Sequence, residues 1–234
     1  MDQFARTQLL LHREGIERLH AARVAVFGVG GVGGYTAEAL VRSGVGAIDL
    51  YDNDTVSLTN LNRQIIALHS TLGQYKVDVM AARARDINPE IKVGAFRMFY
   101  MPENADTVDL SRYDYVIDAI DTVTAKLELI VRCTALQVPI LCAMGAGNKL
   151  DPSRLVVTDL YKTETCPLAR VMRTECRRRG IKRLKVTYST EPALTPELTE
   201  ETTGRRATPG STAFVPSAMG LLIAAEVVKD LTAR

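Results

Sequence analysis

Short apolar runs alternate with amphipathic segments over the first two-thirds of the chain. The runs lie at 23–28, 47–52, 91–96, 115–120 and 139–145. Their continuous Val, Ile and Leu content is typical of parallel strands buried on both faces. The segments between them, at 32–44, 71–87 and 123–136, carry apolar residues at helical spacing. This alternation predicts an α/β fold with a Rossmann-like, doubly wound, mainly parallel sheet.

The pattern changes after residue 150. Two further strand-like runs, 154–160 and 184–190, flank a basic segment at 165–179 that has helical spacing. An apolar helix is expected at 216–232, and a short one near the start at 14–22. Residues 191–210 are rich in Pro, Thr, Glu and Gly, which predicts a mobile loop. The parallel sheet is therefore expected to gain additional C-terminal strands and helices.

Composition narrows the location and the partners. The 234 residues carry a net charge of only +2, so bulk charge does not indicate a DNA-binding protein, and no DNA target is expected. None of the four cysteines forms a CxxC pair, which argues against a structural zinc site and favours free thiols in a reducing cytoplasm. The longest apolar stretch contains Pro216 and Glu226 and is too short to span a bilayer, so no stable membrane insertion is expected.

A glycine-rich turn follows the first predicted strand. It reads GVGGVG, with glycines at Gly28, Gly30, Gly31 and Gly33, and it opens a helix. Glycines let the backbone turn tightly and approach a phosphate, while the helix N-terminus offers unpaired N–H groups. The turn by itself therefore indicates a nucleotide, and NAD is the commonest ligand of such a loop.

The residues after the second strand favour ATP. Asp52 ends that strand, where a Rossmann unit places the carboxylate that binds ribose. Arg63 and Lys76 follow; a nicotinamide cofactor needs neither, but a triphosphate carries charge that two cations neutralise. Asp121 follows a strand at the carboxyl edge of the sheet, where it could hold Mg²⁺ beside the phosphates.

Taken in order, the turn at 28–33, the segment DNDTVSLTNLNRQ at 52–64, Lys76 and DAIDT at 118–122 resemble the ubiquitin-activating-enzyme superfamily. Its bacterial members activate sulfur-carrier proteins for molybdopterin and thiamine synthesis. The resemblance implies ATP and Mg²⁺ binding and adenylation of a carboxylate. The nucleotide-binding residues it implies are Gly28, Gly30, Gly31, Gly33, Asp52, Asp54, Asn60, Arg63, Lys76 and Asp121. The catalytic residues it implies are Arg63, Lys76, Asp121 and Arg6, the last lent across a homodimer.

Residues 151–181 and YSTEPAL at 188–194 resemble one branch of that superfamily, the tRNA threonylcarbamoyladenosine dehydratases. This branch implies ATP-driven ring closure of a threonylcarbamoyl group on an adenosine next to the tRNA anticodon. The carrier-protein activators usually hold zinc through two CxxC pairs, which this chain lacks. We therefore expect one domain over 1–234, with an ATP-binding part at 1–150 and an extension at 151–234 for substrate, RNA and subunit contacts.

Basic residues cluster in the extension. Residues 170–185 hold eight basic side chains and one acid, Glu175. The candidate RNA contacts are Arg170, Arg173, Arg177, Arg178 and Lys182, with Arg205 and Arg206 as additions from the loop. Aromatic residues for base stacking are sparse here, with only Tyr188 nearby, so RNA binding is expected to rest on shape and charge. The alternative reading is an ordinary solvated helix.

Other functions stay open at this stage. An activator of a ubiquitin-like sulfur carrier would share the ATP site, and a sulfur-transfer protein is kept as a candidate partner. An NAD-dependent dehydrogenase would leave Arg63 and Lys76 unexplained. A non-catalytic nucleotide sensor is the remaining class. Cys166, at the start of the basic helix, could serve as an acyl or sulfur acceptor, although a structural thiol is favoured.

Overall fold

The computed structural model describes residues 2–197 and 209–233. It contains a seven-stranded sheet in the order β3-β2-β1-β4-β5-β7-β6. The strands are β1 (Arg23–Phe27), β2 (Ala47–Tyr51), β3 (Lys92–Phe96), β4 (Tyr115–Asp118), β5 (Ile140–Ala143), β6 (Leu155–Asp159) and β7 (Lys185–Ser189). Every pairing is parallel except the one between β6 and β7. The predicted α/β class and its additional C-terminal strands are confirmed.

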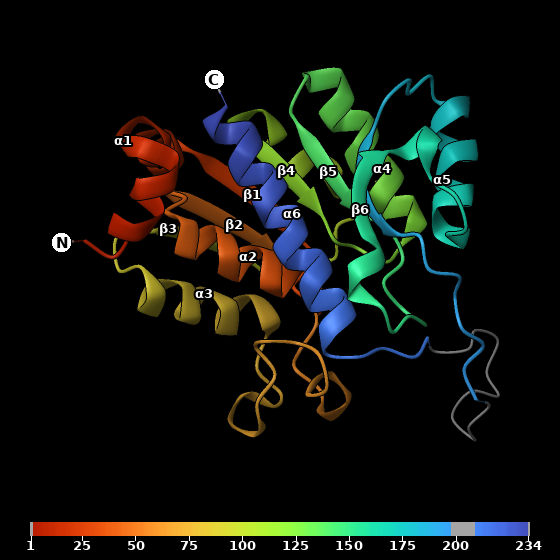
Figure 1. Cartoon of the computed structure of the whole chain (residues 1–234), viewed down its shortest axis with the longest axis horizontal. Coiled ribbons are helices and arrows are strands. Elements are labelled where there is room, and N and C mark those ends of the chain that lie inside the picture. The colour runs from red at the N-terminus through yellow and green to blue at the C-terminus, as the bar shows by residue number, and fades with distance from the viewer. Residues whose placement is uncertain (1, 198–208, 234) are drawn as a thin grey trace.

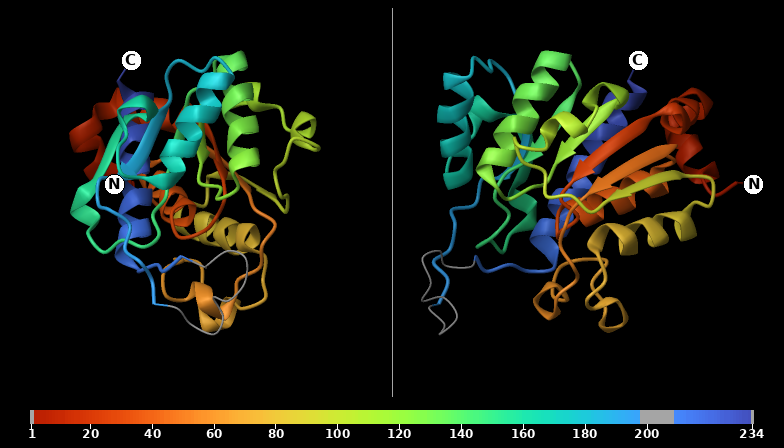
Figure 2. Two further views of the ribbon diagram at one scale, coloured as in Figure 1. Left: turned by 90° about the vertical axis from the view of Figure 1, so that its right-hand side faces the viewer. Right: turned by 180° about the vertical axis from the view of Figure 1, so that it is seen from behind.

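Helices cover both faces of the sheet (Figures 1 and 2). They are α1 (Ala5–Ala21), α2 (Gly33–Ser43), α3 (Lys76–Ile87), α4 (Val123–Leu136), α5 (Pro167–Arg178) and α6 (Phe214–Thr232). On one face, α6 packs against α1 and α2, and α3 packs against α2. On the other face, α4 and α5 pack together over β5 and β7. The C-terminal helix α6 thus completes the helical layer on the first face of this doubly wound fold.

Three predicted helix boundaries were wrong. Helix α1 begins at Ala5 instead of residue 14, and it is broken at His12, whose φ of 58° is not helical. Helix α3 begins at Lys76 instead of residue 71, because Gly73 has a φ of 79° that ends any helix there. Helix α5 begins at Pro167, whose ring fixes a helical φ and lacks the N–H that a first turn cannot use.

The topology creates a site at the carboxyl edge. The helix that follows β1 lies on one face of the sheet, and the helix that follows β4 lies on the other. The switch point of the topology therefore falls between these two parallel neighbours. At such a switch point the connections leave in opposite directions and open a crevice. The long connection at 52–75 projects from this edge, below the sheet in Figure 1. In the described part of the chain, no helix is long and apolar enough to cross a membrane.

Candidate nucleotide site

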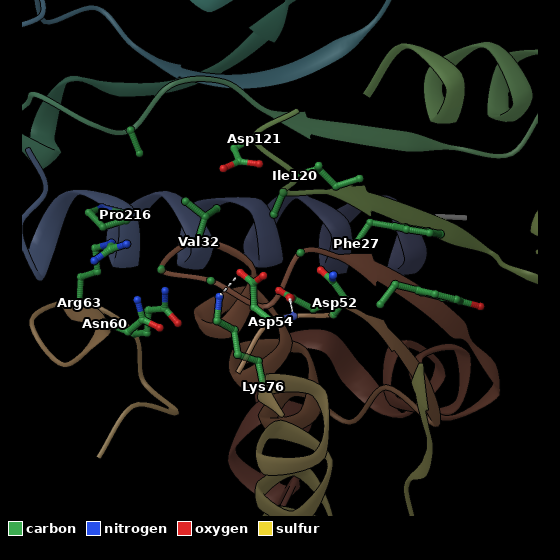
Figure 3. A pocket seen from close by; sticks show the side chains of 18 of the residues that line it. Phe27, Val32, Asp52, Asp54, Asn60, Arg63, Lys76, Ile120, Asp121 and Pro216 are labelled. Atoms are coloured by element: carbon green, nitrogen blue, oxygen red, sulfur yellow. Dashed lines mark hydrogen bonds and ion pairs between the residues drawn. The ribbon is translucent and has the colours of Figure 1, made fainter. Parts of the chain in front are cut away.

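A cavity of about 460 Å³ opens at the switch point (Figure 3). Its size suits a small-molecule ligand. It is lined by nine of the ten predicted nucleotide-binding residues: Gly28, Gly30, Gly31, Asp52, Asp54, Asn60, Arg63, Lys76 and Asp121. The sequence prediction that these positions gather at one place is therefore matched by the geometry.

Gly33, the tenth, does not line the cavity. It is buried, and a Cβ built on it would lie 1.8 Å from the Gly28 carbonyl oxygen. Gly28 has a φ of +90°, and its own Cβ would lie 2.6 Å from the Ala119 carbonyl oxygen. Both glycines therefore bring backbone close to backbone, Gly33 between strand and helix and Gly28 between the first turn and β4.

Asp52 ties the glycine turn to the next strand. Its Oδ2 accepts a hydrogen bond from Val29 N at 2.7 Å, and its Oδ1 accepts one from Asp54 N at 2.8 Å. The side chain is partly exposed at the cavity, and each carboxylate oxygen retains a further lone pair. Asp52 can therefore shape the phosphate turn and still accept hydrogen bonds from ribose hydroxyls.

Lys76 places a buried cation in the cavity wall. Its side chain is 7% exposed, and its Nζ lies 2.7 Å from Oδ2 of Asp54, a carboxylate that is 63% exposed. Its backbone N also donates to the Asp54 carbonyl at 3.0 Å, which fixes the start of α3 against the loop. Among the described residues Asp54 is the counter-ion of this ammonium, which leaves two of its three donors for a ligand.

Arg63 and Asn60 lie on the opposite wall of the cavity from Asp52 (Figure 3). Arg63 Nη1 donates to the Thr59 carbonyl at 2.9 Å and to Asn62 Oδ1 at 2.9 Å, so its guanidinium has a defined place. Asn60 Oδ1 accepts from Ser57 N at 3.1 Å, which leaves its amide N–H₂ group as a donor. These donors face the glycine turn and suit phosphate oxygens.

Asp121 is the exposed carboxylate at the edge formed by β4 (Figure 3). No group of three or more His, Cys, Asp or Glu side chains that could hold a metal occurs in the described ranges. One carboxylate suffices for Mg²⁺, which commonly takes its other ligands from water and substrate phosphates. The residues present therefore fit a magnesium ion carried with the nucleotide, with Asp121 as its protein ligand.

Arg6 does not line the cavity of its own chain. Helix α1 lies at the amino end of the strands, where Phe4 packs edge-on against His20 with ring centroids 5.2 Å apart. Leu9 and Leu10 on the same helix are 78% and 82% exposed. A contribution from Arg6 to ATP would therefore have to come from a second copy of the chain.

The apolar side of the cavity was missed in the sequence. It includes Met98, Phe99 and Tyr100 after β3 and Pro209 and Pro216 before and within α6, with the polar Ser211 between the two prolines. Tyr100 packs edge-on against Phe27 with ring centroids 5.0 Å apart. These residues lie far from the glycine turn in sequence and carry no motif, so only the fold brings them there.

The predicted basic helix is helical, but its arginines differ in their surroundings. Arg170 is exposed, whereas Arg173 Nη1 donates to the Thr163 carbonyl at 2.8 Å and to its hydroxyl. Arg178 Nη1 lies 2.7 Å from Oε1 of Glu175. The guanidinium groups of Arg173 and Arg178 therefore already make some of their polar contacts within the protein.

Of the remaining RNA candidates, Arg177 and Lys182 lie at and just after the end of α5, whereas Arg205 and Arg206, like most of the loop predicted at 191–210, lie outside the described residues. The Arg177 guanidinium lies 5.1 Å from the ring centroid of Tyr161, and Lys182 is exposed beside them. Tyr188, the aromatic residue noted near the basic helix, is only 4% exposed because it packs in the core under α5. Tyr161, which the sequence analysis did not single out, is the aromatic residue that contacts Arg177.

All four cysteines are buried. Burial raises the pKa of the Cys133 thiol to about 12, that of Cys176 to about 11, and that of Cys142 well above its usual value. Cys166 is 3% exposed and packs in the core between α5 and the sheet. The favoured reading of Cys166 as a structural thiol fits this burial.

Comparisons with known proteins identify the family of the chain. The model of the ThiF family matches residues 4–234. The tRNA threonylcarbamoyladenosine dehydratase of Bacillus subtilis (strain 168) is 46% identical over 99% of this chain and 95% of its own length. The crystal structure of the E. coli tRNA N6-threonylcarbamoyladenosine dehydratase in complex with ATP matches with a TM-score of 0.88 at 35% identity, covering 99% of this chain and 94% of that one. Its complex with AMP matches with a TM-score of 0.91, also at 35% identity and with the same coverage. The ordered motifs of the cavity and the match over nearly the whole length agree, and the chain belongs to the ThiF family.

Proposed function

We propose that this protein is an ATP-dependent tRNA threonylcarbamoyladenosine dehydratase. The observation that carries the proposal is the cavity at the switch point, where Lys76, Arg63 and Asn60 surround a glycine turn. Near-full-length similarity to dehydratases, one of them solved both with ATP and with AMP, supports the choice of substrate.

The chemistry begins with activation of a carboxylate. An oxygen of the threonylcarbamoyl carboxylate attacks the α-phosphorus of ATP, the bond to the bridging oxygen breaks, and pyrophosphate leaves. An internal nucleophile of the modification then attacks the activated carbonyl carbon, and AMP leaves with the former carboxylate oxygen. The net change is loss of one water from the nucleoside. No covalent intermediate with the enzyme is needed.

The protein supplies positioning and charge. Lys76 and Arg63 neutralise the phosphates as pyrophosphate departs, and Asn60 donates from the same side. Asp52 holds the ribose, and Gly28, Gly30 and Gly31 let the phosphates approach the backbone. Magnesium, when bound beside Asp121, adds charge neutralisation at the phosphates. Arg63, Lys76 and Asp121 are thus the catalytic residues of this proposal.

The working form in this proposal is a cytoplasmic homodimer. Arg6 would act in trans at the partner's ATP, and the exposed Leu9 and Leu10 on the same helix offer an apolar surface for the contact. Within the single domain, residues 1–150 would bind ATP and residues 151–234 would contact tRNA and the second subunit. On the tRNA side, Arg170, Arg177 and Lys182 present exposed cations to phosphates.

The second candidate, an activator of a sulfur-carrier protein, shares the adenylating cavity. Carrier activation with sulfur transfer calls for an accessible thiol on the enzyme or a partner. All four thiols of this chain are buried, and burial raises the pKa of three of them. The thiols therefore favour the dehydratase over a sulfur-handling enzyme.

The two functions separate in one experiment. Purified protein is given ATP and Mg²⁺ with tRNA bearing threonylcarbamoyladenosine, and in parallel with a small carrier protein that ends in Gly-Gly. Release of pyrophosphate and AMP with the tRNA alone supports the dehydratase. Turnover with the carrier alone would contradict it and support the second candidate.

A further inference from the structure

An ion pair is buried beneath the turn that carries Asp121. Asp118 ends β4 and Lys126 lies in the first turns of α4, and neither side chain is exposed to solvent. Lys126 Nζ lies 2.9 Å from Asp118 Oδ2. Removing two charges from water costs several kcal/mol per ion, and an apolar pair of the same volume is often as stable. Stability alone therefore does not account for a charged pair at this place.

The pair fixes both backbone polar groups of Ile120, in the two successive peptides of the turn. Lys126 Nζ donates to the Ile120 carbonyl at 2.9 Å, and Asp118 Oδ1 accepts from Ile120 N at 3.1 Å. Ile120 directly precedes Asp121, and both line the cavity. The N–H and the C=O of the residue before the carboxylate are thus both fixed by buried charges.

The same turn also sets the place of the glycine loop. The Ala119 carbonyl would lie 2.6 Å from a Cβ on Gly28, so the two backbones are in direct contact. A shift of the 118–121 turn would therefore move the carboxylate at the cavity edge relative to the phosphate turn. In a site that works by positioning, a displacement of about 1 Å can cost a hundredfold in rate.

We propose that Asp118 and Lys126 are positioning residues that hold Asp121 where it can take up the magnesium that accompanies ATP. This inference rests on the proposed function, because it needs Asp121 to serve the metal side of an ATP site. Neither residue touches the nucleotide in this account, and both act through the backbone N–H and C=O of Ile120.

The test uses a neutral pair. The double variant Asp118→Asn, Lys126→Met retains an oxygen that can accept from Ile120 N and removes both buried charges together, so no lone charge remains in the core. The readout is thermal stabilisation by ATP, first in EDTA and then over a magnesium titration. We expect ATP stabilisation in EDTA to change little and the magnesium concentration at half effect to rise about tenfold, as for other residues that orient metal ligands.

A double-mutant cycle that combines the neutral pair with a substitution of Asp121 shows whether the pair acts through Asp121. Asp121→Asn should raise the magnesium midpoint by itself, and adding the neutral pair to it should raise the midpoint no further. Lys185→Met is the matched control, because Lys185 Nζ forms ion pairs with Glu226 and Asp230 at the amino end of β7, away from the cavity. It should change stability without changing the magnesium midpoint.

Two outcomes overturn the inference in different ways. A wild-type magnesium midpoint in the folded neutral-pair variant would show that the pair is only structural, while the proposed function stands. Stabilisation of the wild-type protein by ATP without any magnesium dependence would remove the metal side of the proposed function and this inference with it. If the neutral pair does not fold, Lys126→Arg keeps the charge but alters the grip on Ile120, and an unshifted midpoint there overturns the inference equally.

Discussion

Lys76 Nζ lies 2.7 Å from Asp54 Oδ2 in the wall of the cavity, and only the lysine is buried. The pair continues a chain of contacts from the glycine turn, because Asp52 bonds to Val29 N on one side and to Asp54 N on the other. The exposed carboxylate of Asp54 therefore holds a buried ammonium in place where phosphates of a nucleotide would meet it.

Replacing Lys76 by Met should remove the charge and keep the buried volume. We expect the rate of ATP consumption with substrate tRNA to fall about a hundredfold, because a preorganised cation at the phosphates is lost. The melting temperature without nucleotide should change little, since Asp54 is mostly solvated. Steady-state pyrophosphate release measures the rate. Lys92→Met, an exposed lysine on the edge strand β3, is the control, and wild-type turnover in Lys76→Met would contradict the assignment.

Two glycines of the same turn should respond differently to alanine. At Gly33 the new Cβ would lie 1.8 Å from the Gly28 carbonyl oxygen, so Gly33→Ala should destabilise the fold by about 3 kcal/mol. At Gly30 the nearest atom to a Cβ is Gln64 Nε2 at 3.9 Å, so Gly30→Ala should keep its stability and lose ATP affinity. Chemical denaturation and nucleotide titration measure the two effects. Equal stability of the two variants would show that the close packing at Gly33 is not needed.

The arginines of α5 should separate into RNA contacts and structural contacts. Arg170→Glu should weaken tRNA binding about tenfold at low salt and reduce its salt dependence, because an exposed phosphate contact is lost. Arg173→Met should mainly lower stability, since Arg173 bonds to Thr163. Filter binding at several salt concentrations tests both. Arg85→Glu on α3 is the charge-matched control, and equal losses for Arg85→Glu and Arg170→Glu would contradict a specific basic surface.

Glu38 should make stability depend on acid pH. Burial raises the pKa of this carboxyl, but hydrogen bonds from Arg83 and Arg42 outweigh it, so the pKa lies below its usual value. A lowered pKa contributes stability above the unfolded-state value of about 4.3 and loses it as the pH falls through the folded-state value. Glu38→Gln should therefore cost about 2 kcal/mol near pH 7 and much less near pH 3. Urea unfolding at both pH values measures this, and a cost that is independent of pH would contradict it.

The sequence predicts the sheet well because buried parallel strands consist of continuous apolar runs. All seven predicted strands occur, and the site residues gather because parallel strands share a carboxyl edge. The helix beginnings were less predictable, since the start of α3 depends on the positive φ of Gly73 and that of α1 on packing of Phe4 against His20.

The parts that could not be predicted depend on contacts between distant segments. Lys126 lies in the first turn of α4 and resembles an ordinary helix charge in the sequence, and only the fold shows that it and Asp118 are both buried. Tyr188 and Tyr161 are similar in sequence surroundings, yet β7 buries the first and leaves the second beside Arg177. Neither difference has a local signal in the sequence.

The central claim is that ATP drives loss of water from one modified nucleoside. The most direct measurement incubates tRNA bearing threonylcarbamoyladenosine with the protein, ATP and Mg²⁺, and then determines the nucleoside masses under conditions that do not reopen the ring. The account predicts a nucleoside lighter by one water, formed with the wild-type protein, absent without ATP and strongly reduced with Lys76→Met. An unchanged nucleoside in the presence of ATP, with the protein folded and able to bind ATP, would contradict the dehydratase function.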